Sequence, residues 1–258
     1  MSAIVSLHGV ELSYPIYSIR AHSLRNTIAN FAIGGTLLKD GQDIVHVRAL
    51  SGVTFDLHEG DRLGIIGHNG AGKTTLLKVI AGIYEPDRGL VEVVGNISSM
   101  IDIGLGLDST LTGRENILTM GRMRGFSTRQ TLAKIPGIIE FSELGQYIDL
   151  PVKTYSAGMQ ARLVFAVATS LDPDVLLLDE WIGAGDASFH EKAKSRMEGI
   201  LEKSRILVLA THNFTLVQAV CNKLVVLDGG RQVFFGDTED WDFKAQAPKV
   251  PPPAAVRA

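Results

Sequence analysis

One glycine-rich stretch carries the residue types that bind a phosphate group. Residues 67–74 read GHNGAGKT, which matches the pattern G-x-x-x-x-G-K-[ST]. The glycines let the backbone curl so that successive N–H groups point at phosphate oxygens, and Lys73 adds a positive charge. An apolar run at 62–66 precedes the stretch and a helical pattern follows it, so the positive end of a helix would also face the phosphate. The sequence therefore predicts a phosphate-binding loop made of Gly67, His68, Asn69, Gly70, Ala71, Gly72, Lys73, Thr74 and Thr75.

Two carboxylates follow a second apolar run. Asp179 and Glu180 end the segment DVLLLDE at 174–180, and ligands of open α/β sheets bind at the carboxyl ends of such strands. Mg²⁺ prefers oxygen ligands, so Asp179 and the Thr74 hydroxyl are its candidate ligands. Glu180 is the candidate base that orients or deprotonates a hydrolytic water. Two acids can also simply mark where a strand leaves the core, but the nearby phosphate-binding loop favours the catalytic interpretation.

A histidine ends the next apolar run. His212 closes the segment RILVLATH at 205–212, so it would lie at the same sheet edge as the two carboxylates. A lone histidine is usually structural, but this position favours a contact with the γ-phosphate. The other six histidines lack such a position, although His68 lies within the loop itself. Together these residues predict hydrolysis of a nucleoside triphosphate, with Lys73, Glu180 and His212 as its catalytic groups.

The elements that would hold these residues alternate between strands and helices. Continuous apolar runs at 174–180 and 205–212 are typical of parallel strands buried on both faces. Alternating apolar residues at 3–13 and 50–57 predict antiparallel strands. A hairpin that turns at Asp-Gly-Gly is expected within 223–237. This order predicts an α/β fold with a parallel sheet, an antiparallel edge and a helical insertion.

The insertion is expected to form an all-helical block at about 97–159. Thr112 is followed by Glu115 three residues later, which is a capping-box signal for the start of a helix. Helical patterning continues over 128–150, and the turn TYSAGMQ at 154–160 leads into a strongly apolar helix.

Two further segments have their own patterns. Within 16–46, apolar residues recur at near-helical spacing, which predicts an amphipathic helix at 19–33 and then a turn at 39–43. The last eighteen residues, 241–258, include four prolines and few residues that would pack, so a mobile tail is expected there.

Composition excludes several classes of protein. The chain has 258 residues, of which 45% are apolar, and a net charge of -3, which gives no sign of a nucleic-acid-binding surface. Its single cysteine, Cys221, cannot form an internal disulfide and is expected to be a small buried apolar residue. The apolar stretches are too short to span a membrane, and the N-terminus lacks the pattern of a signal peptide.

The order of these motifs resembles the nucleotide-binding subunit of ABC transporters over about residues 3–240. The resemblance implies a P-loop NTPase fold with a RecA-like parallel core at about 1–96 and 160–240, the helical subdomain at 97–159, and the insertion at 16–46. ATP and Mg²⁺ would be its cofactors. A second copy of the chain would complete each site in a head-to-tail dimer.

The resemblance also implies roles for residues outside the loop. TYSAGMQ takes the place of the family's signature motif, so Ser156 and Gly158 would contact the γ-phosphate, while GAGD gives Asp186 as the acid of the D-loop. Tyr14 is the best match for the aromatic residue that stacks on adenine, with His46 and Tyr17 as alternatives. The usual glutamine of the Q-loop is missing, and Asp102 is a candidate substitute, also as a metal ligand.

The departures from the common signature resemble one branch, the ATPases of bacterial polysaccharide exporters. Tyr155, Ala157 and Met159 stand where Leu, Gly and Gln are usual, and an N-terminal insertion is present. The resemblance implies export of O-antigen or a similar lipid-linked polysaccharide by a homodimer with two copies of a transmembrane permease, at the cytoplasmic face of the inner membrane. No nucleic acid is expected as a partner, and no carbohydrate-binding domain is expected in this chain. The helix at 19–33 would lie near permease or lipid, or else pack on its own β-subdomain.

Three alternatives belong to other functional classes. The chain could be the ATPase of another transporter class, or a soluble ABC ATPase that acts on DNA or ribosomes. The short distance from Lys73 to Ser156, 83 positions, and the single set of motifs argue against the soluble types. An unrelated P-loop kinase or GTPase would leave Ser156, Asp186 and His212 unexplained.

Overall fold

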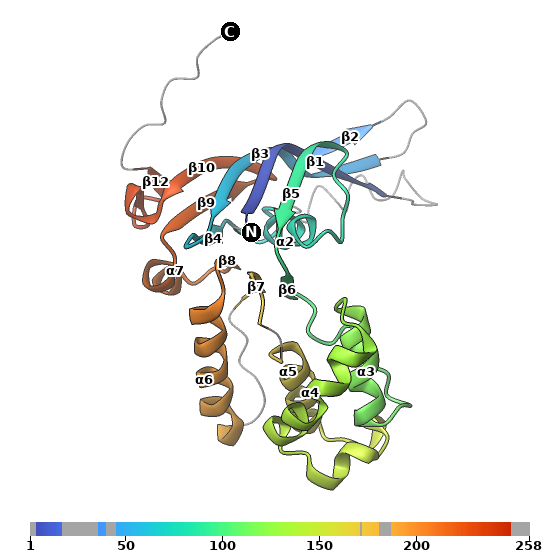
Figure 1. Cartoon of the computed structure of the whole chain (residues 1–258). Coiled ribbons are helices and arrows are strands. Elements are labelled where there is room, and N and C mark those ends of the chain that lie inside the picture. Colours follow the sequence, from blue (N-terminus) through green and yellow to red (C-terminus); the bar gives the residue numbers. More distant parts are fainter. Residues whose placement is uncertain (1–3, 17–35, 40–44, 171, 181–186, 249–258) are drawn as a thin grey trace. The chain divides into compact units, whose positions relative to one another are not determined.

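The computed structural model describes residues 4–16, 36–39, 45–170, 172–180 and 187–248 (Figure 1). The chain forms two compact units. The first comprises Met1–Gly95, Leu177–Glu180 and Arg205–Ala258, and the second comprises Asn96–Leu176 and Trp181–Ser204. Among the described residues, no helix has the length and apolar character needed to cross a membrane.

Strands dominate the first unit. They run in the order β5-β1-β3-β10-β9-β4-β8-β7, and β2 pairs with β3 at the side. The strands are β1 (Ile4–Ile16), β2 (Thr36–Lys39), β3 (Val45–His58), β4 (Arg62–Ile66), β5 (Arg88–Val94), β7 (Val175–Asp179), β8 (Ile206–Ala210), β9 (Lys223–Asp228) and β10 (Arg231–Asp237). Of β7, only the part from Leu177 onward belongs to the first unit. Two helices, α2 (Lys73–Ile80) and α7 (Phe214–Val220), belong to the same unit.

The parallel part of the sheet is built on β4, which pairs in parallel with β8 on one side and β9 on the other. All five residues of β8 are buried, as are the last four of β4. Continuous apolar sequence therefore forms strands covered on both faces, and the prediction of a parallel sheet is confirmed.

The antiparallel part is built on β1, which pairs with both β3 and β5. The buried residues of β1 include Val5, Leu7, Val10 and Leu12. They alternate with less buried residues except between Leu7 and Val10, where the pairing with β3 shifts register. β1 continues past the predicted end at residue 13 to Ile16, and β3 begins before the predicted start at residue 50, at Val45.

The predicted hairpin turn at Asp-Gly-Gly is confirmed, because β9 and β10 pair antiparallel on either side of it. Gly229 and Gly230 both have positive φ, 53° and 81°, as a two-residue hairpin loop of this kind requires.

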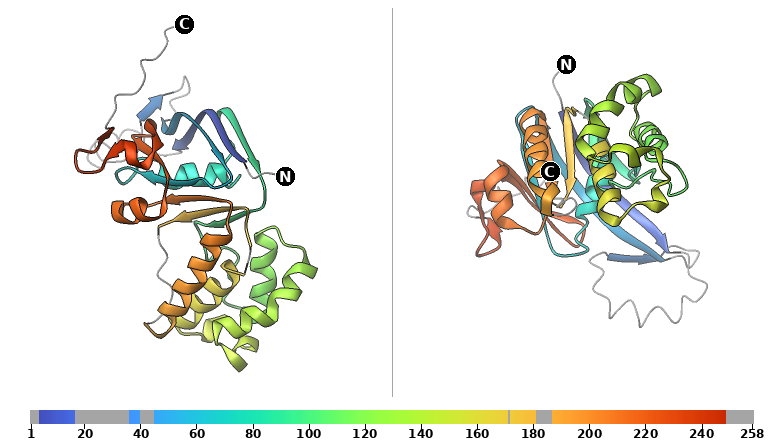
Figure 2. Two further views of the ribbon diagram at one scale, coloured as in Figure 1. Left: turned by 60° about the vertical axis from the view of Figure 1, so that its left-hand side comes forward. Right: turned by 90° about the horizontal axis from the view of Figure 1, so that it is seen from below.

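The second unit is mainly helical. Its helices are α3 (Gly113–Met123), α4 (Thr128–Ser142), α5 (Ala157–Ala168) and α6 (Ala187–Lys203), with short 3₁₀ turns η1 (Gly145–Asp149) and η2 (Val152–Thr154). The helices coloured green to yellow gather in one bundle (Figure 2). Buried apolar residues of α3, α4 and α5, among them Ile117, Ile138 and Leu163, form its core. The predicted capping box at Thr112 and Glu115 is confirmed at the start of α3.

Two predictions about the elements are wrong. The segment 97–159 is not all helical, because it opens with the strand β6 (Ile97–Met100), in which Ser98 and Met100 are buried. Residues 241–248 are not a mobile tail, because β11 (Trp241–Asp242) pairs with β12 (Ala247–Pro248) after the turn η3 (Thr238–Asp240). Trp241 is buried against Phe234, with ring centroids 5.1 Å apart, and this contact holds the segment to the sheet.

Two other predictions lie outside the described residues. These are the amphipathic helix at 19–33 and, apart from Lys39 at the end of β2, the turn at 39–43. The part of the predicted tail at 249–258 also lies outside the described residues.

Candidate active site

The predicted phosphate-binding loop connects the end of β4 to the start of α2. Gly70 and Gly72 have φ values of 80° and 104°, which residues with a side chain rarely adopt. A Cβ atom on Gly72 would also lie 2.7 Å from the carbonyl oxygen of Ala49. Glycine is therefore required there, and the tight turn places the first N–H groups of α2 at the loop.

Lys73 lies across the loop that precedes it. Its Nζ atom donates hydrogen bonds to the carbonyl oxygens of Gly67, at 2.9 Å, and His68, at 3.2 Å. The lysine ammonium group is thereby held beside the curled backbone, where a bound phosphate would meet both a full charge and backbone N–H groups.

Thr74 and Asp179 are brought together from positions far apart in the sequence. The Thr74 hydroxyl donates to Asp179 Oδ2 at 2.7 Å, which joins the first turn of α2 to the end of β7. Two oxygen ligands of the kind that Mg²⁺ prefers are therefore adjacent at the loop.

Glu180 and His212 form the second pair at this edge. Glu180 Oε1 lies 2.7 Å from His212 Nδ1, and the two side chains are 50% and 75% exposed. Glu180 has φ of 69°, and its N–H donates to the carbonyl oxygen of Ala210 at 2.7 Å. A non-glycine residue in the left-handed region costs about 1–3 kcal/mol, and such strain is concentrated at functional sites.

Tyr14 lies beside the loop because β1 extends to Ile16 and pairs with β3. Its hydroxyl is 3.5 Å from Thr75 Oγ1, and its ring meets Tyr84 edge-on with centroids 5.5 Å apart. Burial raises the pKa of the Tyr14 phenol. Lys78 Nζ lies 5.4 Å from the centroid of the Tyr84 ring. These contacts fix the orientation of Tyr14.

A cleft of about 530 Å³ joins these groups within the first unit. It is lined by Tyr14, Val47, Ala49, Asn69, Gly70, Gly72, Lys73, Thr74, Thr75, Asp179 and Glu180. The cleft thus has an aromatic residue at β1 and carboxylates at the end of β7, with the loop between them. Of the two alternatives to Tyr14, His46 does not line this cleft and Tyr17 lies outside the described residues.

Sequence reasoning missed two partners of the predicted residues. His68 Nε2 lies 3.1 Å from Asp228 Oδ1 at the end of β9, and its Nδ1 lies 2.7 Å from the Asn69 carbonyl oxygen. Tyr84, the contact of Tyr14, follows α2 in the turn YEPDRG. Neither pairing has a local signal, because each joins residues that are distant in the sequence.

Other predicted site residues belong to the second unit. Ser156 is the N-cap of α5, and its hydroxyl accepts a hydrogen bond from the Met159 N–H at 3.2 Å. Gly158 lies in the first turn of the same helix. Tyr155 is buried and donates to the Tyr147 carbonyl oxygen at 2.7 Å. Asp186 lies outside the described residues.

Asp102 lies exposed in an irregular segment after β6. This segment is held by Arg124, which donates to the carbonyl oxygens of Ile103, at 2.6 Å, and Leu105, at 3.2 Å. Burial lowers the pKa of the Arg124 guanidinium group, and the nearby Asp102 carboxylate opposes this shift. Asp102 is in the second unit, whereas Thr74 and Asp179 are in the first.

Comparison with known proteins identifies the protein family to which this chain belongs. The family model for ABC transporters matches residues 50–183. The chain also resembles a dimeric ATP-binding cassette in a post-hydrolysis state bound to ADP and Pi, with a TM-score of 0.62 and 20% identity over 91% of this chain and 98% of that one. The chain belongs to the ABC transporter family and is an ATPase of that family.

Relatives within the family carry more specific names. The O-antigen export system ATP-binding protein RfbE of Yersinia enterocolitica is 45% identical over 221 residues, which are 86% of this chain and 92% of the relative. RfbB of Myxococcus xanthus, with the same description, is 38% identical, and the teichoic acids export ATP-binding protein TagH of Enterococcus faecalis is 42% identical. The match covers 87% and 74% of this chain, but only 52% and 42% of these two longer relatives.

Proposed function

We propose that this chain hydrolyses ATP in the cleft of the first unit to drive export of a lipid-linked polysaccharide. The observation that carries the enzymatic part is the pair of contacts at one edge of the sheet, Thr74 with Asp179 and Glu180 with His212, both 2.7 Å. The loop N–H groups and Lys73 would bind the phosphates of ATP, and the Tyr14 ring would stack on adenine.

Mg²⁺ fits the residues that face the loop. Among the described residues no group of three or more His, Cys, Asp or Glu side chains forms a site of its own for a metal. Magnesium in nucleotide sites is held by one or two protein oxygens together with the phosphates, which agrees with the Thr74 and Asp179 oxygens alone. When bound, the ion would neutralise charge on the β- and γ-phosphates.

Glu180 would act on the attacking water. Its carboxylate is half exposed and lies at the carboxyl end of β7, where the γ-phosphate would be held by Lys73. The carboxylate would accept a proton from the water, or orient it, as the water oxygen bonds to the γ-phosphorus and the bond from that phosphorus to the departing ADP oxygen breaks. His212, hydrogen-bonded to Glu180, would fix the position of this carboxylate and face the γ-phosphate.

The signature residues would act on the ATP of a second copy. Ser156 and Gly158 stand at the start of α5, where helix N–H groups favour a phosphate. In a head-to-tail homodimer they would meet the γ-phosphate held by the partner's loop, with Asp186 at the same interface. Asp102 is the proposed substitute for the Q-loop glutamine, which would make it a candidate contact for the metal and the water.

The transported substrate and the partner rest on the relatives. Proteins named as O-antigen and teichoic acids export ATP-binding proteins recur among them, which supports export of a lipid-linked polysaccharide. A transmembrane permease would be the partner, present in two copies, and would hold the ATPase at the cytoplasmic face of the bacterial inner membrane. ATP-driven closure of the dimer and its reopening after hydrolysis would move the permease.

The enzymatic part is tested by replacing the proposed base. Glu180→Gln keeps the size of the side chain but removes the proton acceptor, so we expect steady-state ATP hydrolysis to fall by about 10²–10⁴-fold while ATP binding persists. Glu92→Gln is the matched control, since Glu92 is exposed on β5 outside the cleft. Hydrolysis in Glu180→Gln equal to that in Glu92→Gln would remove Glu180 from the proposed mechanism.

A further inference from the structure

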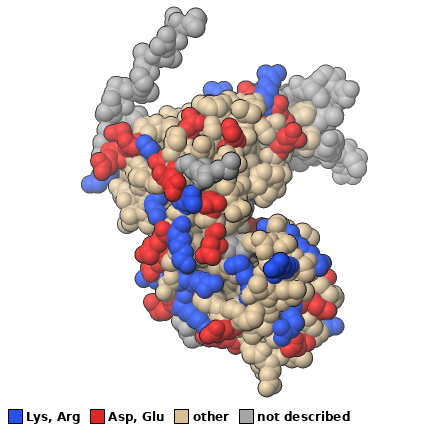
Figure 3. Space-filling model, viewed as in Figure 1, with Lys and Arg blue, Asp and Glu red and all other residues tan. Residues whose placement is uncertain are grey.

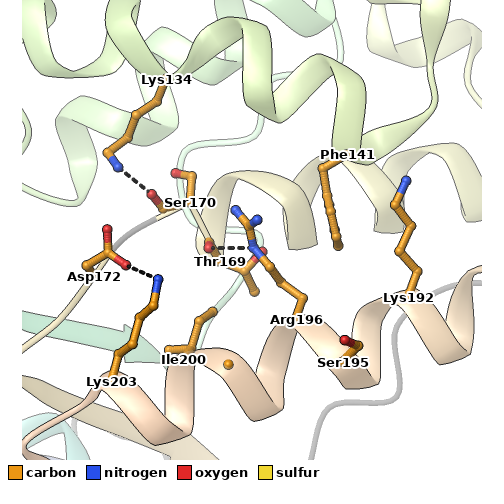
Figure 4. A pocket seen from close by; sticks show the side chains of 11 residues that line it. Lys134, Phe141, Thr169, Ser170, Asp172, Lys192, Ser195, Arg196, Ile200 and Lys203 are labelled. Carbon is orange, nitrogen blue, oxygen red and sulfur yellow. Dashed lines mark hydrogen bonds and ion pairs between the residues drawn. The ribbon is translucent and has the colours of Figure 1, made fainter.

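A second hollow of about 570 Å³ lies within the second unit (Figure 4). Its walls come from α4, from the end of α5 and from one face of α6. All of its lining residues belong to this unit, so the hollow is independent of the cleft at the phosphate-binding loop. None of the residues assigned above to ATP lines it.

Four basic side chains face this hollow: Lys134, Lys192, Arg196 and Lys203. The last three lie on one face of α6, because their spacings of four and seven residues correspond to one and two helical turns. Lys and Arg side chains also gather over this part of the second unit in the space-filling view (Figure 3).

Carboxylates offset only part of this charge. Lys192 pairs with Glu143 at 2.7 Å, and Lys203 lies 3.6 Å from Asp172. Glu143 is shared, since Arg162 also lies 3.0 Å from it. The hollow therefore carries a surplus of positive charge, which attracts an anion.

The two remaining cations are bound by neutral groups. Lys134 Nζ donates to the Ser170 carbonyl oxygen at 2.7 Å, and Arg196 Nε donates to the Thr169 carbonyl oxygen at 3.2 Å. These bonds cap the C-terminal end of α5, which is a sufficient structural role for one N–H of each residue. A lysine has three donors and an arginine five, so donors remain for a ligand.

An aromatic ring and a glycine complete the hollow. The Phe141 ring lies 4.9 Å from Arg196 Cζ and 5.0 Å from Lys192 Nζ, which orders both cations. Gly199 lies inside α6, where glycine costs about 1 kcal/mol relative to alanine. A Cβ atom on Gly199 would meet no residue from outside its own turn of α6 within 4 Å, so there is room for a side chain at this lining position.

We propose that this hollow binds a compact phosphate-bearing anion, either a soluble phosphate compound or the headgroup of an anionic lipid. Arginine and lysine together suit phosphate oxygens, because the guanidinium fork gives directed bonds and the ammonium groups give charge. Lys134 of α4 and Arg196 of α6 face the hollow from two sides, which suits a compact anion, whereas Lys192 and Lys203 lie toward its two ends (Figure 4).

Pyrophosphate binding to the full chain tests the proposal. The measurement is isothermal titration calorimetry in a Lys73→Ala background, which weakens binding at the other phosphate site. We expect Lys134→Ala and Arg196→Gln each to lower the affinity by at least about tenfold, the size expected for loss of a charge-assisted hydrogen bond. Lys194→Ala is the matched control, because it removes the same charge from an exposed position of α6 outside the hollow.

A second variant tests binding without removing the hydrogen bonds that Lys134 and Arg196 make at the end of α5. Gly199→Leu removes no charge and no residue that caps α5, but it adds a bulky side chain at a position that lines the hollow, and leucine is a good helix former. We expect it to abolish pyrophosphate binding while the thermal midpoint is maintained. Affinity in Lys134→Ala and Gly199→Leu equal to that in Lys194→Ala would overturn the proposal.

Vesicles distinguish the two sources of phosphate. Cosedimentation with phosphatidylcholine vesicles is compared with and without phosphatidylglycerol, for the Lys194→Ala and Gly199→Leu variants. Binding that needs phosphatidylglycerol and is lost in Gly199→Leu would identify a lipid headgroup, whereas a loss confined to pyrophosphate would identify a soluble compound. The effect of Lys134→Ala is also compared for two ligands, an oligoglutamate peptide and pyrophosphate. If the substitution weakens binding of the peptide but not of pyrophosphate, the proposed phosphate site is contradicted.

Discussion

Individual residues at the cleft show how local backbone and long-range pairing act together. Gly72 makes the sharp entry to α2, and its φ of 104° cannot be supplied cheaply by another residue. Glu180 is held in a strained conformation at the end of β7, with its carboxylate against His212. The strain is offset by the surrounding sheet, and it aims a carboxylate at the cleft.

The role proposed for Tyr14 can be separated from its hydroxyl group. We expect Tyr14→Ala to weaken ATP binding by roughly 5–150-fold, because stacking of a base on an aromatic ring contributes about 1–3 kcal/mol. Tyr14→Phe keeps the ring and its edge contact with Tyr84, and loses only the long contact with Thr75. Fluorescence titration with a labelled ATP analogue should give near-normal affinity for Tyr14→Phe. Equal weakening in both variants would argue against stacking.

Cys221 gives a prediction about pH. It is buried at the end of α7, and burial raises the pKa of its thiol from 9.0 to about 12. The unfolded chain loses this proton first as pH rises above about 9, so the folded state loses stability between pH 9 and 12. Between pH 8 and 10.5 we expect the wild type to lose about 2 kcal/mol more free energy of unfolding than Cys221→Ala does. Urea unfolding of both proteins measures this, and parallel curves would contradict the shift.

At the scale of elements, α5 links the signature turn to a packed core. Ser156 caps the helix, Tyr155 is buried beneath it, and the apolar face of α5 packs with α3 and α4. The hydroxyl of Ser156 is therefore positioned by a helix start that the chain needs for its own stability. Its proposed contact with ATP uses a geometry that is already fixed.

Two substitutions at Ser156 separate these two roles. Ser156→Ala removes the cap, so we expect it to lower the free energy of unfolding by about 1 kcal/mol. Ser156→Asn keeps an N-capping side chain, and we expect near-normal stability. Both lack the hydroxyl proposed to meet the γ-phosphate, so both should lose ATPase activity. Full activity of Ser156→Asn in a steady-state assay would show that the hydroxyl acts only as a cap.

The elements also show what the sequence could predict. Continuous apolar runs predicted β7 and β8, the pattern Asp-Gly-Gly predicted the β9–β10 turn, and Thr112 with Glu115 predicted the start of α3, because each signal is local. The strand β6 was missed because ISSM carries only two apolar residues, and β11 with β12 because their pairing depends on the contact of Trp241 with Phe234. The contact of His68 with Asp228 arises because β4 pairs with β9, and no local sequence pattern predicts which strands pair.

At the scale of the whole molecule, the proposed ATP residues are divided between the two units. Lys73, Asp179 and Glu180 belong to the first unit, and Ser156 belongs to the second. In a head-to-tail dimer, the first unit of one chain and the second unit of its partner would hold one ATP molecule. The binding energy of the shared nucleotide would then drive closure of the dimer, and hydrolysis of that nucleotide would allow the dimer to reopen.

The most direct test of this account is the mass of the Glu180→Gln protein with ATP, measured by light scattering after size exclusion. Slow hydrolysis should preserve the shared nucleotide, so we predict a dimer with ATP and a monomer without it. Adding Ser156→Arg to the same chain should leave a monomer, because the arginine would block the partner's phosphate site. A Glu180→Gln protein that binds ATP yet stays monomeric would contradict the account.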